Sequence, residues 1–385
     1  MRLALIADWL VTHGGAEHVI EEFLEVFPDS PLFTTVAKRG SLGPLDRADI
    51  KTTPLQMLYR ILGRHQILLP FMPKAIEGID LRGFDVVLSS SHAVAKGVIP
   101  PAGCVHVCYC HTPMRYAWEM ENEYLQDFAI PQWLRPRVKR ELKKLRRWDL
   151  ATAKRVDVFI ANSKTTQERI SRIYGRDSEV LPPPVHERYF EIVLADAKGE
   201  VRSAKYEGRN DSSYFLAVGR FVPYKRFDLL IETANALGLH LKIAGSGQEE
   251  AKLRRMAGPT VAFLGRVPDA DLPALYAGAT ALLFPPFEDA GIVPLEAQAC
   301  GTPVIAYKAG GALDAIEENQ TGIFFDEQTQ SSLTEALKRF ESLTWDPSRI
   351  REHARRFSQD RFRERIEEIV TEARERLERG ESFDK

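Results

Sequence analysis

The chain has 385 residues, of which 44% are hydrophobic and 28% are charged, and its formal net charge is −2 at pH 7. At about 150 residues per domain, this length indicates two or three globular domains. The small net charge excludes a global attraction to nucleic acid or to a membrane, so any such attraction has to be local. No apolar run approaches the ~18 residues of a membrane-spanning helix. Asp8 interrupts the first apolar run too early for a signal peptide. We therefore expect a soluble, cytoplasmic protein.

Short apolar runs rich in β-branched residues alternate with amphipathic stretches, which is typical of α/β proteins with doubly wound parallel sheets. Strands are expected at 3–8, 32–36, 84–89, 105–110, 156–161, 214–219, 239–244, 261–265, 281–284 and 304–307. Helices are expected at 16–27 and 164–174. One long charged helix at about 349–379 closes the chain, with Phe357, Phe362 and Ile366 on its apolar stripe.

The segment Leu181-Pro-Pro-Pro-Val185 is rigid and extended, and a polar stretch follows it at 195–213. These features divide the chain into two α/β domains, one at 1–190 and the other at 191–354. The closing helix, at 355–385, is expected to cross back to the first domain. Ligands of such sheets bind at the carboxyl ends of the strands, so two facing sheets predict a cleft between the domains.

Cys104, His106, Cys108 and Cys110 alternate with apolar residues just before His111. A zinc site is one interpretation of this pattern, but alternation is typical of a strand. Residues two apart on one face of a strand are separated by about 6.6 Å, so the four side chains span more than one tetrahedral ion can bridge. A buried strand is therefore favoured.

The segment from Phe284 to Ala306 carries the strongest pattern in the chain. A strand ends at Phe284, a loop follows, and a helix begins near Gly291. The free N–H groups of Gly291 and Ile292 then form an anion site. Glu296, one turn into that helix, is placed to accept hydrogen bonds from ribose hydroxyls, and Glu288 on the loop is placed to orient a sugar.

Two other interpretations of this segment remain. A glycosidase places its two carboxylates about 5–9.5 Å apart, whereas the backbones of Glu288 and Glu296 are expected to lie roughly 12 Å apart. Spacing alone leaves open a third interpretation, a helix with a capping acid and an exposed glutamate.

The segment from Phe284 to Ala306 closely resembles the Glu-x7-Glu signature of the retaining glycosyltransferases of family 4, in the identity of its residues as well as in their spacing. Five further segments match the family in order along the chain. They are Gly14-Gly15-Ala16-Glu17, Ala161-Asn-Ser163 with the proline hinge, Ala217–Arg226, Ala244-Gly245-Ser-Gly247 and Phe263-Leu-Gly-Arg266-Val267. The resemblance implies two Rossmann-like domains (the GT-B fold) and a nucleotide-sugar donor. It assigns Arg220 and Lys225 to the diphosphate, and Gly245, Arg266 and Val267 to the nucleoside.

Those assignments agree with the chemistry of the residues. Arg220 and Lys225 lie five residues apart across a turn, so two cations can clamp a departing diphosphate. Either one alone is better interpreted as a solvated surface charge. Gly14 and Gly15 allow the backbone to approach a donor phosphate or an acceptor closely, although an ordinary turn before a helix has the same pattern.

His111 begins a His-Thr-Pro segment that resembles one in bacterial polysaccharide members of the family, where the matching histidine lies beside the transferred sugar. His111 is therefore expected to bind a sugar hydroxyl or to stabilise a positively charged transition state. A structural histidine is the alternative. Arg115 and Trp118 follow as candidate acceptor contacts.

Asp269-Ala-Asp271 matches the Asp-x-Asp metal motif of the other glycosyltransferase fold. Here it precedes a helical pattern, so either acid is interpreted as a helix N-cap. No metal and no cofactor are expected.

A basic amphipathic helix is predicted at 135–147, which holds eight Lys or Arg residues and one Glu and is flanked by Trp133 and Trp148. An apolar stretch lies upstream at 55–72. Together they predict docking of the first domain on the anionic inner face of the cell membrane, beside a polyprenyl-linked acceptor. A solvated helix face is the alternative.

These features predict a retaining, metal-independent transfer of a hexose to a glycan or a lipid-linked glycan, with no role for nucleic acid. The resemblance implies a front-face mechanism in which the departing diphosphate assists deprotonation of the acceptor. Glu288-Asp289 resembles a branch rich in mannosyltransferases, so mannose from GDP-mannose is the expected donor. Ala290 replaces the aromatic residue usual in that branch. A UDP-sugar donor, or a non-catalytic nucleotide- or glycan-binding relative, are the alternatives.

Overall fold

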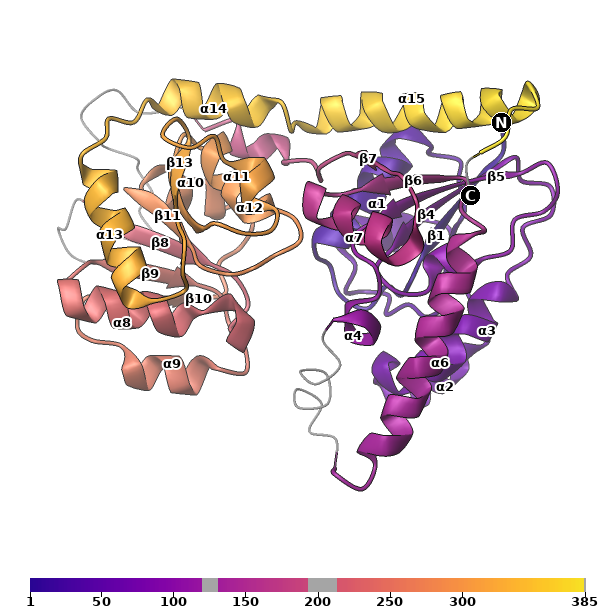
Figure 1. Cartoon of the computed structure of the whole chain (residues 1–385), viewed down its shortest axis with the longest axis horizontal. Helices are drawn as coiled ribbons and strands as arrows, with labels where there is room; N and C mark the ends of the chain where they lie inside the picture. Colours follow the sequence, from indigo (N-terminus) through magenta and orange to yellow (C-terminus); the bar gives the residue numbers. More distant parts are fainter. Residues whose placement is uncertain (120–130, 193–212, 384–385) are drawn as a thin grey trace. The chain divides into compact units, whose positions relative to one another are not determined.

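The computed structural model describes residues 1–119, 131–192 and 213–383, which form two compact units (Figure 1). Unit 1 comprises Met1–Pro183 and Phe362–Lys385, and unit 2 comprises Pro184–Arg361. The borders predicted from the sequence, after residues 190 and 354, each differ by seven residues from these divisions. Almost all of the polar stretch expected at 195–213 lies outside the described residues.

Unit 1 contains a seven-stranded sheet in the order β3-β2-β1-β4-β5-β6-β7, and every paired strand is parallel to its neighbour. Its strands are β1 (Leu3–Ala7), β2 (Leu32–Thr34), β3 (Ile50–Thr52), β4 (Val86–Ser91), β5 (Val105–Cys110), β6 (Val158–Ala161) and β7 (Glu179–Val180). β3 and β7 were not expected, because two or three residues are too few to show a period.

Helices cover both faces of this sheet. They are α1 (Gly15–Val26), α2 (Leu55–Leu62), α3 (Met72–Glu77), α4 (Arg115–Trp118), α6 (Arg135–Ala153), α7 (Lys164–Tyr174) and α15 (Gln359–Glu378), with short 3-10 turns η1 (Gly43–Arg47), η2 (His65–Phe71) and η3 (Ala95–Gly97). On one face, α1 and α15 share a core with β1, β4 and β5. On the other, η2, α3 and α6 pack together.

The return of the C-terminal helix to the first domain is confirmed. Phe362, Ile366 and Val370 are almost fully buried, and they pack against the strands of unit 1. Buried apolar residues recur every three or four positions along α15, so one face of this helix is apolar and the opposite face is charged.

The expected single helix at 349–379 is wrong in one respect, because it consists of two helices, α14 (Pro347–Arg355) and α15. Between them, the Phe357 carbonyl accepts a hydrogen bond of 2.8 Å from the Val185 N–H, and Ser358 forms a bridge with Val185. This pairing with a distant extended segment takes the backbone out of the helical conformation.

The cysteine-bearing segment is a buried strand, as expected, and its three cysteines are free, as is Cys300 in unit 2. Val105, Val107 and Tyr109 of β5 face the core shared with α1 and α15, whereas Cys108 and Cys110 face the one formed with α7. Burial raises the pKa of the Cys108 thiol to about 12. The thiolate form that binds metal is therefore strongly disfavoured there.

Unit 2 contains a six-stranded parallel sheet in the order β10-β9-β8-β11-β12-β13. Its strands are β8 (Phe215–Val218), β9 (Leu241–Ala244), β10 (Val261–Gly265), β11 (Ala281–Phe284), β12 (Val304–Tyr307) and β13 (Gly322–Phe325). Its helical segments are η4 (Glu187–Tyr189), η5 (Pro223–Lys225), α8 (Phe227–Leu237), α9 (Glu250–Met256), α10 (Leu272–Ala277), α11 (Ile292–Ala299), α12 (Ala312–Ala315), α13 (Gln330–Glu341) and α14. α8, α9 and α13 share one core with the sheet, and α10, α11, α12 and α14 share the other.

The strand order reverses once in each sheet, between β1 and β4 in unit 1 and between β8 and β11 in unit 2. Loops that leave neighbouring strands at such a point run in opposite directions and leave space between them. In open α/β sheets this is the place where ligands bind.

Candidate functional site

Lys225 and Glu288 form an ion pair at the switch point of unit 2. Lys225 ends η5 after β8, and Glu288 lies on the loop after β11, so the two come from the strands that flank the reversal. The Lys225 side chain is only 10% exposed and that of Glu288 is 19% exposed. A cation held there, at the carboxyl edge of the sheet, is suited to bind an anionic ligand.

Glycines allow the loops around this pair to approach one another closely. Gly245, directly after β9, has φ +144°, and a Cβ at this position would lie 1.9 Å from the Gly219 carbonyl oxygen. Gly310, after β12, has φ +62°, and its Cβ would lie 2.1 Å from the Glu288 carbonyl oxygen. Side chains at these positions would push the loops apart, which explains why glycine is required.

α11 begins at Ile292 with Gly291 at its N-cap, and no side chain caps it. Its first backbone N–H groups lie beyond the carboxyl end of β11, as the anion-site prediction requires. Gly291 packs closely against Gly311, because a Cβ at Gly291 would lie 2.7 Å from the Gly311 carbonyl oxygen. Pro294 lies in the first turn of the helix, as expected.

Glu296 accepts a hydrogen bond of 2.9 Å from the Tyr276 hydroxyl. Burial, reinforced by the negative charge of Glu296, raises the pKa of Tyr276 well above its usual value, so the phenol stays a donor. Tyr276, which lies on α10, is not among the site residues predicted from the sequence. A carboxylate has further lone pairs, so Glu296 remains able to accept from a ribose as well.

Arg220 and Arg266 are exposed, whereas Val267 is 7% exposed and packs in the core of unit 2. Within the part of the chain that the structure describes, the Arg220 guanidinium has no hydrogen bond or ion pair, so it is available to a ligand. Any contact of Val267 with a nucleotide has to come from its backbone.

At the switch point of unit 1, Asp8 forms a network that the sequence analysis missed. Its carboxylate accepts hydrogen bonds from the N–H groups of His92, Ala93 and Ala95 at 2.7, 3.1 and 2.6 Å, and it pairs with His92 Nδ1 at 2.9 Å. Burial by itself raises the pKa of Asp8, but the His92 charge and these hydrogen bonds outweigh it and hold the pKa below its usual value. Burial lowers the pKa of His92, but the Asp8 charge, the hydrogen bond to Asp8 and the Glu17 charge together outweigh burial and raise the pKa above its usual value.

His111 follows β5 and lies beside this network. Its Nε2 is 2.8 Å from the Ser90 hydroxyl, and its ring contacts the His92 ring edge-on at 6.3 Å. Burial and the neighbouring His92 lower the pKa of His111 to about 3. The imidazole is therefore neutral at physiological pH, which favours a hydrogen-bonding role over a cationic one.

Gly14 precedes α1 and Gly15 begins it. Glu17, in the first turn, is 9% exposed, and burial raises the pKa of its carboxyl group. The structure thus places a glycine-rich loop and a buried acid directly after β1, one strand from His92.

Trp118 donates a hydrogen bond of 2.7 Å to the buried Asp149, and the guanidinium of Arg146 lies 5.3 Å from the centre of its ring. These contacts join α4 to α6 and give Trp118 a structural role, while contact with an acceptor stays a prediction. Arg115 begins α4 and is partly buried.

Asp271 occupies the N-cap position of α10, but its side chain forms no capping hydrogen bond, so the capping prediction is only half right. Asp269 is 60% exposed and lies 3.9 Å from Arg188. Asp271 has helical φ and ψ, whereas a residue that caps a helix through its side chain usually has an extended backbone.

The lowered pKa of His111 predicts a pH effect on stability. Below about pH 6.5 the unfolded chain protonates this residue, whereas the folded protein does not until about pH 3, so stability falls as the pH falls through this window. Urea unfolding of His111→Asn should show a shallower loss of stability between about pH 7 and pH 5 than the parent protein. If the free energy of unfolding has the same dependence on pH in both proteins, His111 takes up its proton in the folded state as readily as in the unfolded chain.

The family model described as Glycosyltransferase Family 4 matches residues 13–188, and the model described as Glycosyl transferases group 1 matches residues 200–357. The sucrose-phosphate synthase of Thermosynechococcus elongatus superposes with a TM-score of 0.72 at 18% identity, over 97% of this chain and 99% of that one. This likeness concerns the fold, which is the expected pair of Rossmann-like domains.

Two curated relatives are 31% identical to parts of the chain. The D-inositol 3-phosphate glycosyltransferase of Salinispora arenicola matches over 246 residues, 56% of this chain and 55% of that protein. A GDP-mannose-dependent alpha-(1-6)-phosphatidylinositol monomannoside mannosyltransferase of Mycolicibacterium smegmatis matches over 201 residues, 47% of this chain and 52% of that one. The chain thus spans about half the length of these relatives. Because the two family models between them match most of both units, the chain belongs to family 4 of the glycosyltransferases.

Proposed function

We propose that the protein is a retaining glycosyltransferase that moves a hexose, mannose from GDP-mannose, to a glycan or lipid-linked glycan. The observation that carries this proposal is the ion pair of Lys225 with Glu288 at the β8–β11 switch point. It joins the cation assigned to the donor diphosphate to the first glutamate of the family signature.

The pair suggests how the donor enters its site. A diphosphate carries more negative charge than a carboxylate, so it competes with Glu288 for the Lys225 ammonium. Glu288 is then released to accept hydrogen bonds from the sugar. Lys225, the exposed Arg220 and the N–H groups at the start of α11 would stabilise the charge that develops on the leaving diphosphate.

Neutral His111 has a complementary role toward the transferred sugar. An uncharged imidazole donates or accepts a hydrogen bond from a sugar hydroxyl without adding a charge. No dedicated general base is assigned, because a front-face reaction lets the departing diphosphate take the acceptor proton.

Lys225→Ala should slow transfer by about 10²–10³-fold, since the loss of one electrostatic donor at a transition state costs about 2.7–4 kcal/mol. Steady-state kinetics measures this effect, with Lys338→Ala on the exposed face of α13 as the matched control. Glu288→Gln should keep nucleotide binding and lose turnover. A folded Lys225→Ala protein with unchanged turnover would show that the diphosphate lies elsewhere.

The donor is tested by thermal shift in EDTA with GDP-mannose, UDP-glucose and ADP-glucose. GDP-mannose should raise the melting temperature, because a ligand at 100 times its Kd stabilises the fold by about 2.7 kcal/mol. The name of the mannosyltransferase relative supports this choice. If UDP-glucose alone raises the melting temperature, the donor is a UDP-sugar instead of GDP-mannose, and the protein is still proposed to be a glycosyltransferase.

Turnover is tested on native protein with the stabilising donor and a glycan or lipid-linked glycan acceptor. NMR of the product should show the anomeric configuration of the donor retained, with EDTA present. Donor binding without transfer to any glycan or lipid-linked glycan would favour the non-catalytic alternative, and a strict requirement for manganese would overturn metal independence.

The surface of unit 1 supports a lipid-linked acceptor. α2 and η2 expose Met57, Ile61 and Phe71 at 67%, 81% and 60%, beside a groove of about 1100 Å³ bordered by α6. Arg137, which is exposed, lines this groove together with apolar side chains. Among the described residues, no helix is long and apolar enough to cross a membrane. Apolar side chains next to basic ones suit the interface of an anionic bilayer.

The two tryptophans expected as anchors differ. Trp133 is 81% exposed, in agreement with an interfacial role. Trp148 is not an exposed anchor, because its indole donates to Glu77 at 2.9 Å and its ring packs over Gly97. The helix turns this residue toward the core, one turn beyond Leu145.

Binding to anionic vesicles should therefore be reversible and should weaken with salt, since each basic residue near the leaflet contributes about 1 kcal/mol. Co-sedimentation compares the parent with a variant in which four exposed bases of α6 are changed to Gln. The bases are Arg137, Arg140, Lys143 and Arg147. This variant should lose most of its binding and keep transfer to a water-soluble acceptor.

A matched control changes four bases of unit 2 in the same way. They are Lys252, Arg254, Arg255 and Lys338. Two outcomes would show that α6 is only a solvated helix face. In one, both variants bind the vesicles equally well; in the other, the parent protein stays in the supernatant at low salt.

A further inference from the structure

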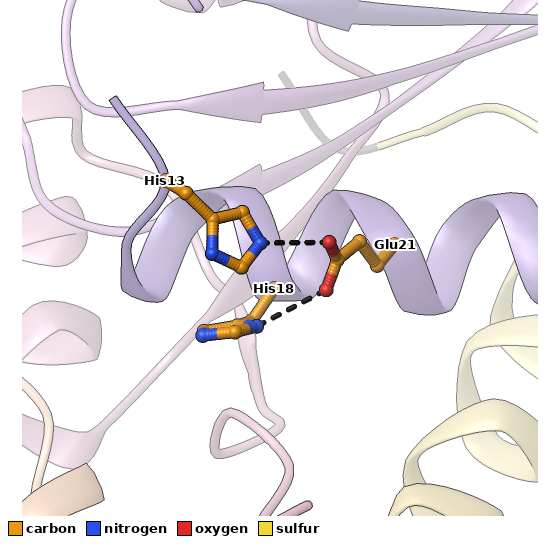
Figure 2. Close-up of side chains that lie close together, drawn as sticks. All are labelled: His13, His18 and Glu21. Atoms are coloured by element: carbon orange, nitrogen blue, oxygen red, sulfur yellow. Dashed lines mark hydrogen bonds and ion pairs between the residues drawn. The ribbon is translucent and has the colours of Figure 1, made fainter. Parts of the chain in front are cut away.

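A second cluster of polar side chains lies at the start of α1, and neither the sequence motifs nor the proposed reaction uses it (Figure 2). His13 comes from the loop after β1, whereas His18 and Glu21 lie three residues apart on one face of α1. His13 Nε2 is 2.7 Å from Glu21 Oε1, and His18 Nδ1 is 3.1 Å from Glu21 Oε2. Both imidazoles therefore converge on one carboxylate.

The positions of the donor atoms suit a metal ion. One nitrogen of each ring and a carboxylate oxygen all lie within 4.8 Å of one another. Zinc binds imidazole nitrogen and carboxylate oxygen at about 2.0–2.2 Å, so its ligand atoms lie roughly 3.3–3.5 Å apart. Small side-chain rotations would bring the three atoms to that spacing, and the carboxylate would then exchange its two hydrogen bonds for bonds to the ion.

The composition of the cluster selects the kind of ion. Two nitrogen ligands disfavour calcium and magnesium, which take oxygen ligands, and favour zinc and its neighbours among the transition metals. Three protein ligands leave one position open for water or another oxygen, as in other His₂Glu zinc sites. The side chains of His13, His18 and Glu21 are 22%, 38% and 17% exposed, so an ion from solvent can reach them.

We propose that His13, His18 and Glu21 form a binding site for a divalent transition-metal ion, with zinc the best match. The ligands flank the glycine-rich loop, because Gly14 and Gly15 lie between His13 and His18 in the sequence. An ion bound there would tie the loop to α1 and restrict its movement. The metal ligands belong to unit 1, whereas Lys225 and Glu288 belong to unit 2, so metal binding can be measured without a nucleotide sugar.

Titration calorimetry with zinc chloride, on the full chain without a histidine tag and without any nucleotide sugar, tests the proposal. One ion should bind per chain. Binding should weaken at least tenfold in His18→Ala and in Glu21→Gln, the second of which keeps the shape of the side chain. His240→Ala, an exposed histidine of unit 2, is the matched control and should bind as the parent does.

Cobalt(II) provides a second readout that identifies the ligands. Nitrogen and oxygen ligands should give visible ligand-field bands without thiolate charge transfer, which distinguishes this site from the four buried cysteines. Thermal unfolding of each variant without metal checks that it is folded. Stoichiometric binding that survives in both folded variants, a thiolate signal, or no binding by the parent would each overturn the proposal and leave the cluster as an ion-pair network. None of these outcomes bears on transfer from a nucleotide sugar.

Discussion

In each sheet the strands are parallel, so their carboxyl ends meet at one edge, and the order of the strands reverses once along that edge. Loops that leave the two strands at the reversal run apart, so the helices that follow leave the edge uncovered there. Asp8 and His92 follow β1 and β4, and Lys225 and Glu288 follow β8 and β11. The chemistry of both units is thus positioned by the same constraint on strand order.

Asp8 and Lys225 are buried at these edges, and the charge of each is compensated in a different way. Asp8 is held by backbone N–H groups and by His92, which together stabilise its ionised form despite burial. Lys225 and Glu288 compensate each other. A buried carboxylate with several N–H donors is satisfied without a ligand, whereas a single ion pair is open to exchange with a stronger anion. This difference suits Asp8 to a structural role and Lys225 to a binding role.

The two units differ in what surrounds these edges. In unit 2, glycines bring the loops after β8, β9, β11 and β12 close together, and α11 adds backbone N–H groups that no side chain of the described residues caps, which suits a compact anionic group. In unit 1, neutral His111 lies near the edge, and the surface carries exposed apolar residues of α2 beside the bases of α6. These features suit hydroxyl groups and a lipid surface, so the proposed donor and acceptor sides follow from different physical chemistry.

The sequence by itself determined the elements that depend on local pattern. β5, β10, β11, β12 and α7 begin and end at the expected residues, and the pattern of the segment from Phe284 to Ala306 placed Glu288 on a loop and Glu296 on a helix. Only the tertiary structure decided the contacts between distant segments. Lys225 pairs with Glu288, Tyr276 donates to Glu296, and Trp148 turns inward. The break before α15 likewise requires Val185. Periodicity reports which face of an element is buried, whereas the identity of the partner depends on how the sheet orders its strands.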